Sequence, residues 1–209
     1  MDPSEVRLLK RAQGDVNRRD ALRTLAAGTI GAVTSTTWVE SLSALAQAHA
    51  HAAASPVATQ GWAPRVLTAR QNTTVITLTE LIIPETDTPG ARAAGVNRFI
   101  DGVLHEATPP DRDRFVRGLA WIDERSTALF GRAFADAGVA QQTTLLTRLA
   151  DADNTDAGDR PGVEFFRAIK SMTISGYYTT EIGLRRELGD DGRLMLAEFE
   201  GCTHPEHQG

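Results

Sequence analysis

A thiol, two imidazoles and a carboxylate lie within six residues of each other in the sequence Cys202-Thr-His204-Pro-Glu-His207. These are the ligand types that zinc prefers, and their spacing resembles that of a metal site. A short tail seldom supplies a closed four-ligand site by itself, so we interpret the stretch as a mixed polar tail. The alternative is an independent exported helical metal-binding protein or enzyme that uses Cys202, His204 and His207.

A second group of potential ligands lies in the acidic stretch Asp151-Ala-Asp-Asn-Thr-Asp-Ala-Gly-Asp159. With Asp153 as the first ligand of an EF-hand calcium loop, Gly158 takes the sixth position and Glu164 the twelfth. Two intermediate ligand positions hold threonine and alanine, however, and Pro161 begins the next helix too early for such a loop. We therefore favour a solvated acidic turn over a calcium site.

The third group, Glu85, Asp87 and Arg92, lies in a segment dense in proline, glycine and threonine. Paired carboxylates can do acid and base chemistry, but this segment offers neither a histidine nor a nucleophile. We expect a structural loop in which Asp87 and the adjacent threonines bond to the backbone. Pro89 and the glycine after it would fix the bend.

Sequence motifs for cofactors and for covalent catalysis are missing. The chain has no Gly-x-Gly-x-x-Gly dinucleotide fingerprint, no Gly-x-Ser-x-Gly elbow and no Cys-x-x-Cys-His haem attachment. The segment Gly90–Gly95 has the glycine spacing of a phosphate loop, but Val96 and Asn97 stand where lysine and a hydroxyl residue are required. We expect this chain to bind no cofactor or metal and to be no enzyme by itself.

Helical periodicity dominates the part of the chain that carries these groups. Apolar residues recur at helical spacing, and alternating strand patterns are almost absent. The clearest helix start is Thr108-Pro109-Pro110-Asp111, with a capping hydroxyl, prolines in the first turn and a carboxylate three residues after the cap. We predict an all-α fold, a single compact domain of five or six helices. The expected helices cover residues 68–83, a stretch ending near 106, a stretch from 108 that includes Leu129, residues 139–150, and a stretch from about 161.

The N-terminal region has the pattern of a bacterial twin-arginine export signal. Arg18 and Arg19 are followed three positions later by Leu22 and then by an uncharged run over residues 24–39. Three small-x-small triplets between Ala46 and Ala52 offer processing sites. We assign residues 1–52 to the signal and processing region, 53–67 to a linker and 68–209 to the helical domain. An amphipathic or disordered tail and an uncleaved anchor are the alternatives.

Charge excludes one class of partner. Of 22 basic and 27 acidic residues, 6 and 5 fall in residues 1–52, which leaves the remainder with a net charge of −6. An acidic domain without basic clusters argues against binding to nucleic acid. The twin-arginine route exports folded proteins, so a protein partner is the better explanation for its use here.

Two segments resemble the gluconate 2-dehydrogenase small subunit (subunit 3) family. One runs from Leu78 to Asp101 and contains Ile-Ile-Pro-Glu-Thr-Asp-Thr-Pro-Gly-Ala; the other is Gly176-Tyr-Tyr-Thr-Thr-Glu-Ile-Gly183. Their order behind a twin-arginine leader also matches. The resemblance implies a non-catalytic subunit that supports the export, maturation and stability of a larger flavoprotein.

The same resemblance implies the other members of the complex. The large subunit would be an FAD-dependent dehydrogenase of the glucose-methanol-choline type that oxidises the CH–OH group of a sugar, sugar acid or glycoside. A cytochrome c subunit with haem c would take the electrons onward. The twin-arginine translocase would deliver the complex to the periplasm, at the periplasmic face of the inner membrane.

Several residues are candidates for the partner interface. The resemblance makes the loop with Asp87, Pro89 and Arg92 a docking surface. Large, partly polar side chains of the kind enriched at interfaces occur at Trp121, Tyr177 and Tyr178, for which an edge of the core is the other interpretation. The single cysteine, Cys202, is a candidate for a disulfide to the large subunit.

Overall fold

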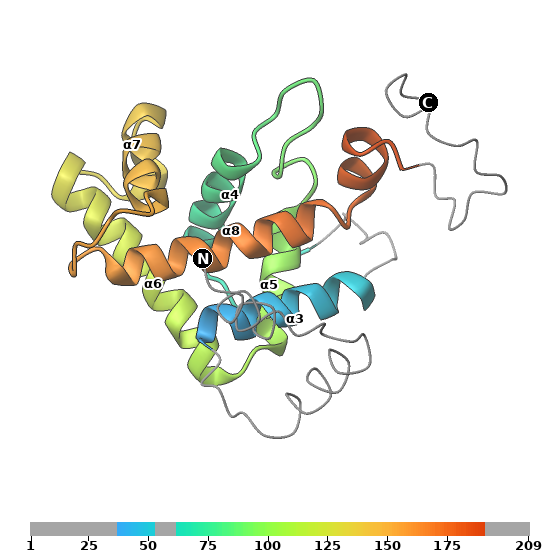
Figure 1. Cartoon of the computed structure of the whole chain (residues 1–209), viewed down its shortest axis with the longest axis horizontal. Coiled ribbons are helices and arrows are strands. Elements are labelled where there is room, and N and C mark those ends of the chain that lie inside the picture. Colours follow the sequence, from blue (N-terminus) through green and yellow to red (C-terminus); the bar gives the residue numbers. More distant parts are fainter. Residues whose placement is uncertain (1–36, 53–61, 191–209) are drawn as a thin grey trace, which may run out of the picture. The chain divides into compact units, whose positions relative to one another are not determined.

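The computed structural model describes residues 37–52 and 62–190, which form six α-helices, a short 3₁₀-helix and one π-helical segment (Figure 1). Within these ranges there is no strand, so the all-α prediction is confirmed. The elements are α3 (Trp38–Ala52), α4 (Ala69–Ile82), α5 (Val96–Glu106), α6 (Pro109–Phe130), η1 (Phe134–Asp136), α7 (Val139–Ala150), α8 (Arg160–Tyr177) and η2 (Ile182–Glu187).

Helix α8 is the element around which the others pack. It contacts α3, α4, α5, α6 and α7, and Figure 1 shows it crossing the domain. Its side chains Phe165, Ile169 and Met172 are fully buried. Two glycines allow close packing between α6 and α8: a Cβ at Gly118 would lie 2.3 Å from the ring of Phe165, and one at Gly162 would lie 2.1 Å from Trp121.

The helix starts follow the capping signals in the sequence. Thr108 accepts a hydrogen bond from the backbone of Asp111 and begins α6, as predicted. Thr68 and Gln71 form a reciprocal capping box at the start of α4. Helix α7 has the predicted bounds. Leu129 is 47% exposed, because the last turn of α6 continues beyond Ser126, the last buried residue of that helix.

Helix α3 falls inside the region that the sequence assigns to signal and processing. Trp38, Leu42 and Ala46 are buried, and the helix contacts α5, α6 and α8 (Figure 1). The leader residues Arg18, Arg19 and Leu22 lie outside the described residues. Cleavage of the leader, and the boundary at residue 52, stay predictions.

In the described part of the chain, no helix combines the length and the hydropathy of a membrane span.

Candidate functional site

The segment between α4 and α5, residues 83–95, is held in one conformation by side chains from outside it, and we call it the fixed loop. The carboxylate of Glu80, in the last turn of α4, joins the two ends of the loop. Its Oε1 accepts a hydrogen bond from the backbone N–H of Glu85 at 3.1 Å, and its Oε2 accepts one from the N–H of Arg92 at 2.8 Å. One side chain therefore satisfies two backbone donors seven residues apart.

The far side of the fixed loop is held by the end of α8. The hydroxyl of Tyr177 donates a hydrogen bond to the carbonyl oxygen of Pro89 at 2.9 Å. The hydroxyl of Thr88 donates to the carboxylate of Glu187 in η2. The two segments that resemble the family signature are thus in direct contact, although they lie about ninety residues apart in the chain.

A glycine is required at position 90 because the backbone there passes close to the backbone at the start of the same loop, at Pro84 and Glu85. A Cβ at this position would lie 2.6 Å from the backbone nitrogen of Glu85 and 2.8 Å from the carbonyl carbon of Pro84. Both neighbours are backbone atoms and cannot rotate away. Ala91, the next residue, is fully buried and donates a backbone hydrogen bond to Ile83 at 2.9 Å.

The loop leaves several polar side chains on the surface while its backbone is fixed. Glu85, Thr86, Asp87 and Arg92 are exposed. The expected side-chain to backbone bonds of Asp87 do not occur; instead Asp87 accepts a hydrogen bond from the hydroxyl of Thr86 at 3.0 Å. Glu80 provides the backbone bonds in its place.

The two tyrosines of the second segment have different environments. Tyr177 is only 1% exposed, so its contribution is to hold the loop from within the core. Tyr178 is half-buried, and its ring meets that of Tyr177 edge-on with centroids 5.2 Å apart. Of the two tyrosines, Tyr178 is therefore the one whose side chain is partly accessible to a partner.

The structure does not bring Trp121 to the same place. Trp121 is partly buried and lies against Gly162, near the start of α8, whereas Tyr177 ends that helix. Fifteen residues of α-helix separate these contacts by roughly 22 Å along the axis. Trp121 therefore occupies an edge of the core at the opposite end of α8.

The acidic stretch 151–159 is arranged around arginines. Asp159 is fully buried and forms ion pairs with Arg148 and, at 3.0 Å, with Arg125. Burial favours a higher pKa for Asp159, but the hydrogen bonds from Arg148 and Asn154 and the charge of Arg125 outweigh it, and the pKa lies below its usual value. The hydrogen bond from Arg148 to Asp159 in turn raises the pKa of that arginine.

Two of the other three carboxylates of this stretch, those of Asp151 and Asp156, also have partners. Asp156 pairs with Arg148 at 2.8 Å and accepts a hydrogen bond from the backbone of Gly158, and Asp151 accepts one from the backbone of Asp153. Among the described residues there is no group of three or more His, Cys, Asp or Glu side chains placed to hold a metal ion. The tail with Cys202, His204 and His207 lies outside the described residues.

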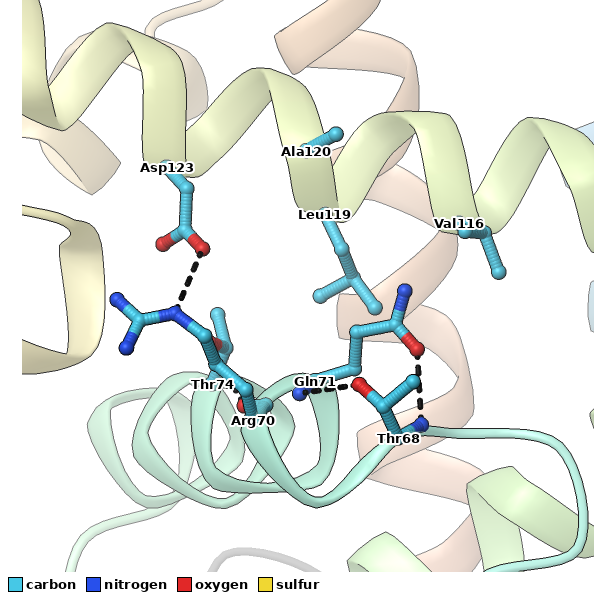
Figure 2. A pocket seen from close by; sticks show the side chains of 8 residues that line it. All are labelled: Thr68, Arg70, Gln71, Thr74, Val116, Leu119, Ala120 and Asp123. Atoms are coloured by element: carbon cyan, nitrogen blue, oxygen red, sulfur yellow. Dashed lines mark hydrogen bonds and ion pairs between the residues drawn. The ribbon is translucent and has the colours of Figure 1, made fainter.

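A small pocket lies between α4 and α6, with a volume of about 260 Å³ (Figure 2). Its polar side chains are engaged with one another. Arg70 faces Asp123 across the pocket at 3.9 Å, and Gln71 accepts a hydrogen bond from the backbone of Thr68. The rest of the wall is formed by Val116, Leu119 and Ala120 on α6.

Glu80 is the site residue that sequence reasoning missed. A glutamate on an amphipathic helix is ordinarily read as part of a solvated face, and nothing in the spacing shows that its two oxygens reach two amides of the next loop. One signal was available. Glu80 lies on the helix four residues before Pro84, and the loop that begins there has no capping side chain of its own for its backbone amides.

Taken together, these features define a small helical domain in which a central helix and one glutamate hold an exposed loop in a single conformation. A family model described as gluconate 2-dehydrogenase subunit 3 matches residues 69–189, more than half of the chain. The chain therefore belongs to the gluconate 2-dehydrogenase subunit 3 family, whose description is that of a subunit in a dehydrogenase complex. No curated protein and no solved structure matches the chain.

Proposed function

We propose that this chain is the non-catalytic small subunit of an exported, FAD-dependent dehydrogenase and that its fixed loop docks onto the large flavoprotein subunit. The flavoprotein would oxidise a CH–OH group of a sugar, sugar acid or glycoside, and a cytochrome c subunit would accept the electrons. The chain's own part is to carry the export signal and to stabilise the folded flavoprotein.

The observation that carries this proposal is the set of side-chain hydrogen bonds that holds the backbone of the fixed loop. Glu80 and Tyr177 hold the loop from two sides, while Asp87 and Arg92 project from it. A surface that is already ordered loses little conformational entropy on association, which favours tight and specific binding. The exposed charges of both signs suit a complementary polar surface on the partner.

The proposed export is consistent with this choice of partner. A protein that crosses the membrane folded can take a bound protein with it, and a flavoprotein has to fold around its FAD before export. The leader pair Arg18 and Arg19 would then serve both chains. The periplasm, at the periplasmic face of the inner membrane, is the proposed location of the complex.

The test is co-expression of the tagged chain with the large open reading frame that neighbours its own. Dye-linked dehydrogenase activity is measured in the periplasm and cytoplasm for the wild type and for Arg18→Lys/Arg19→Lys. We expect a flavoprotein with one FAD to co-purify, and the double variant to leave its activity in the cytoplasm. If the chain is exported alone and nothing co-purifies, the proposal is wrong, and zinc binding by the Cys202 tail becomes the next measurement.

A second pair of variants tests the docking surface. The double charge reversal Asp87→Lys/Arg92→Glu changes exposed side chains of the fixed loop, and Asp113→Lys changes an exposed carboxylate of α6. We expect the first to reduce co-purification of the flavoprotein at least tenfold, with an unchanged melting temperature, and the second to have no effect. Equal recovery from both variants would place the interface elsewhere.

A further inference from the structure

Helix α3 has the features of a permanent part of the domain, although its last turns contain all three candidate processing sites. It begins with a capping box of its own. The backbone of Thr37 donates to the carboxylate of Glu40 at 2.9 Å, and the backbone of Glu40 donates to the hydroxyl of Thr37 at 3.4 Å. Such reciprocal caps define a helix start. The helix is therefore specified from Thr37 onward.

Its apolar stripe is buried in the same core as the other helices. Trp38, Leu42 and Ala46 recur every fourth residue, and Leu42 and Ala46 are fully buried. More of the packing of α3 is made with α8, the central helix, than with any other element, and the two helices run beside each other in Figure 1. Ala46 is also the first residue of the triplet Ala46-Gln47-Ala48.

Polar contacts also fix the first turn of the helix to α8 and to α6. The indole Nε1 of Trp38 donates to Glu164 on α8 at 3.2 Å, and the hydroxyl of Ser41 donates to Asp111 on α6 at 2.9 Å.

The last turns are fixed in the same way. Nδ1 of His49 lies 3.3 Å from the carboxylate of Glu106, and the His49 ring meets Phe99 edge-on at 5.4 Å. His49 also lies over Gly102, where a Cβ would approach its ring to 3.0 Å. His49 is the residue that follows the first triplet, so the chain is held on both sides of that candidate cleavage site.

We propose that α3 is retained in the exported protein and that none of the three alanine triplets is its processing site. This rests on the proposed export of the chain. A peptidase must bind its site as an extended chain with the small side chains in its pockets, and here that requires α3 to unwind and leave the core. Maturation, where it takes place, then cuts before Thr37.

Retention also joins the leader directly to a packed helix. A chain whose core has not formed leaves α3 and its triplets accessible, whereas a folded chain protects them. The accessibility of α3, the segment that follows the export signal, would thus differ between folded and unfolded chains.

The test is the N-terminus of the exported full-length chain, measured by intact mass and N-terminal sequencing of the periplasmic protein. We expect Trp38–Ala52 to be present, whether the leader is cut before Thr37 or remains attached. An N-terminus at His49, His51 or Ala53 would overturn the proposal. Such a result would leave the export proposal intact, because the protein would still have reached the periplasm.

If the chain is not exported in the chosen host, two variants of the full chain allow the same question to be tested by cleavage in vitro. Leu42→Asp places a carboxylate in the buried stripe, and Ala44→Asp places one on the exposed side of the same helix. Full-length precursors purified from the cytoplasm are digested with signal peptidase. We expect the wild type and Ala44→Asp to resist cleavage at the triplets and Leu42→Asp to be cut at least tenfold faster there. Cleavage of the wild type at the rate of Leu42→Asp would overturn the proposal, and resistance of all three also excludes the triplets as the processing site.

Discussion

The hydroxyl of Tyr177 bonds to the carbonyl of Pro89 at 2.9 Å, across 88 positions of sequence. This contact ties the last residue of α8 to the middle of the fixed loop. Since α8 is packed by five other helices, the loop is anchored to the most constrained element of the domain. Its conformation is therefore set before any partner arrives.

Removing this hydroxyl should loosen the loop without disturbing the core. For Tyr177→Phe we expect a loss of about 1 kcal/mol in the free energy of unfolding, the usual value of one hydrogen bond. This corresponds to a fall in melting temperature of roughly 2–4 °C for a domain of this size. Tyr178→Phe, at the half-buried neighbour, is the control and should lower the melting temperature by less. Equal shifts for the two variants would show that the Pro89 contact adds nothing.

The two hydrogen bonds that the carboxylate of Glu80 accepts can be tested through the backbone amides that donate them. In Glu80→Gln one oxygen is replaced by an NH₂ group, so only one of the two amides keeps its acceptor. We expect a loss of about 1–2 kcal/mol. Amide hydrogen exchange at Glu85 or Arg92 should become at least several-fold faster. Glu124→Gln, on an exposed position of α6, should leave both exchange rates unchanged; a loop that exchanges equally in both variants would contradict the assignment.

A methyl group at Gly90 should be poorly tolerated. Gly90→Ala places a Cβ 2.6 Å from the backbone nitrogen of Glu85, so the loop has to move. We expect destabilisation of about 1–3 kcal/mol, as for other overpacked sites, measured by urea unfolding. Gly138→Ala is the matched control, because a Cβ there comes no closer than 3.7 Å to a flexible side chain. A Gly90 variant as stable as this control would mean that the loop adapts freely.

Local signals in the sequence predicted the helices from α4 to α8 well, missed α3, and predicted the fixed loop only in part. Caps such as Thr108 and the apolar spacing of α7 act within one or two turns, so the sequence alone reveals them. The all-α class followed from such patterns, whereas the family followed from the resemblance of residues 78–101 and 176–183 to its signature segments. The bonds of Glu80 and Tyr177 depend on how distant segments meet, and no local pattern specifies that.

Helix α3 shows how one stretch can satisfy two patterns. Alanine triplets suit a processing site, and alanine is also the best helix former. The signals that distinguish the helix were present: Thr37 and Glu40 have capping-box spacing, and the apolar residues Trp38, Leu42 and Ala46 lie four positions apart. Whether that stripe was covered by other helices could be seen only in the structure.

Calcium should have no effect on this protein at the stretch 151–159. The carboxylates of Asp156 and Asp159 are paired with Arg148, so a cation would have to displace an arginine. We expect the melting temperature to be the same in 5 mM CaCl₂ and in excess EDTA, to within about 1 °C. A rise of several degrees with calcium would revive the EF-hand interpretation that the spacing of Asp153 and Glu164 suggested.

Acid should unfold the domain partly through Asp159. Because the folded state holds the pKa of Asp159 below its unfolded value, the ionised carboxylate contributes stability above about pH 4, and this is lost as the pH falls through the folded pKa. Asp159→Asn should cost about 2 kcal/mol at pH 7, less than for a fully buried pair because both arginines reach solvent. Its stability should then vary less than that of the wild type between pH 5 and about 3, as followed by urea unfolding. Asp153→Asn, at an exposed position of the same stretch, should keep the wild-type profile. If the two variants shared one acid profile, Asp159 would not be the group whose protonation weakens the fold.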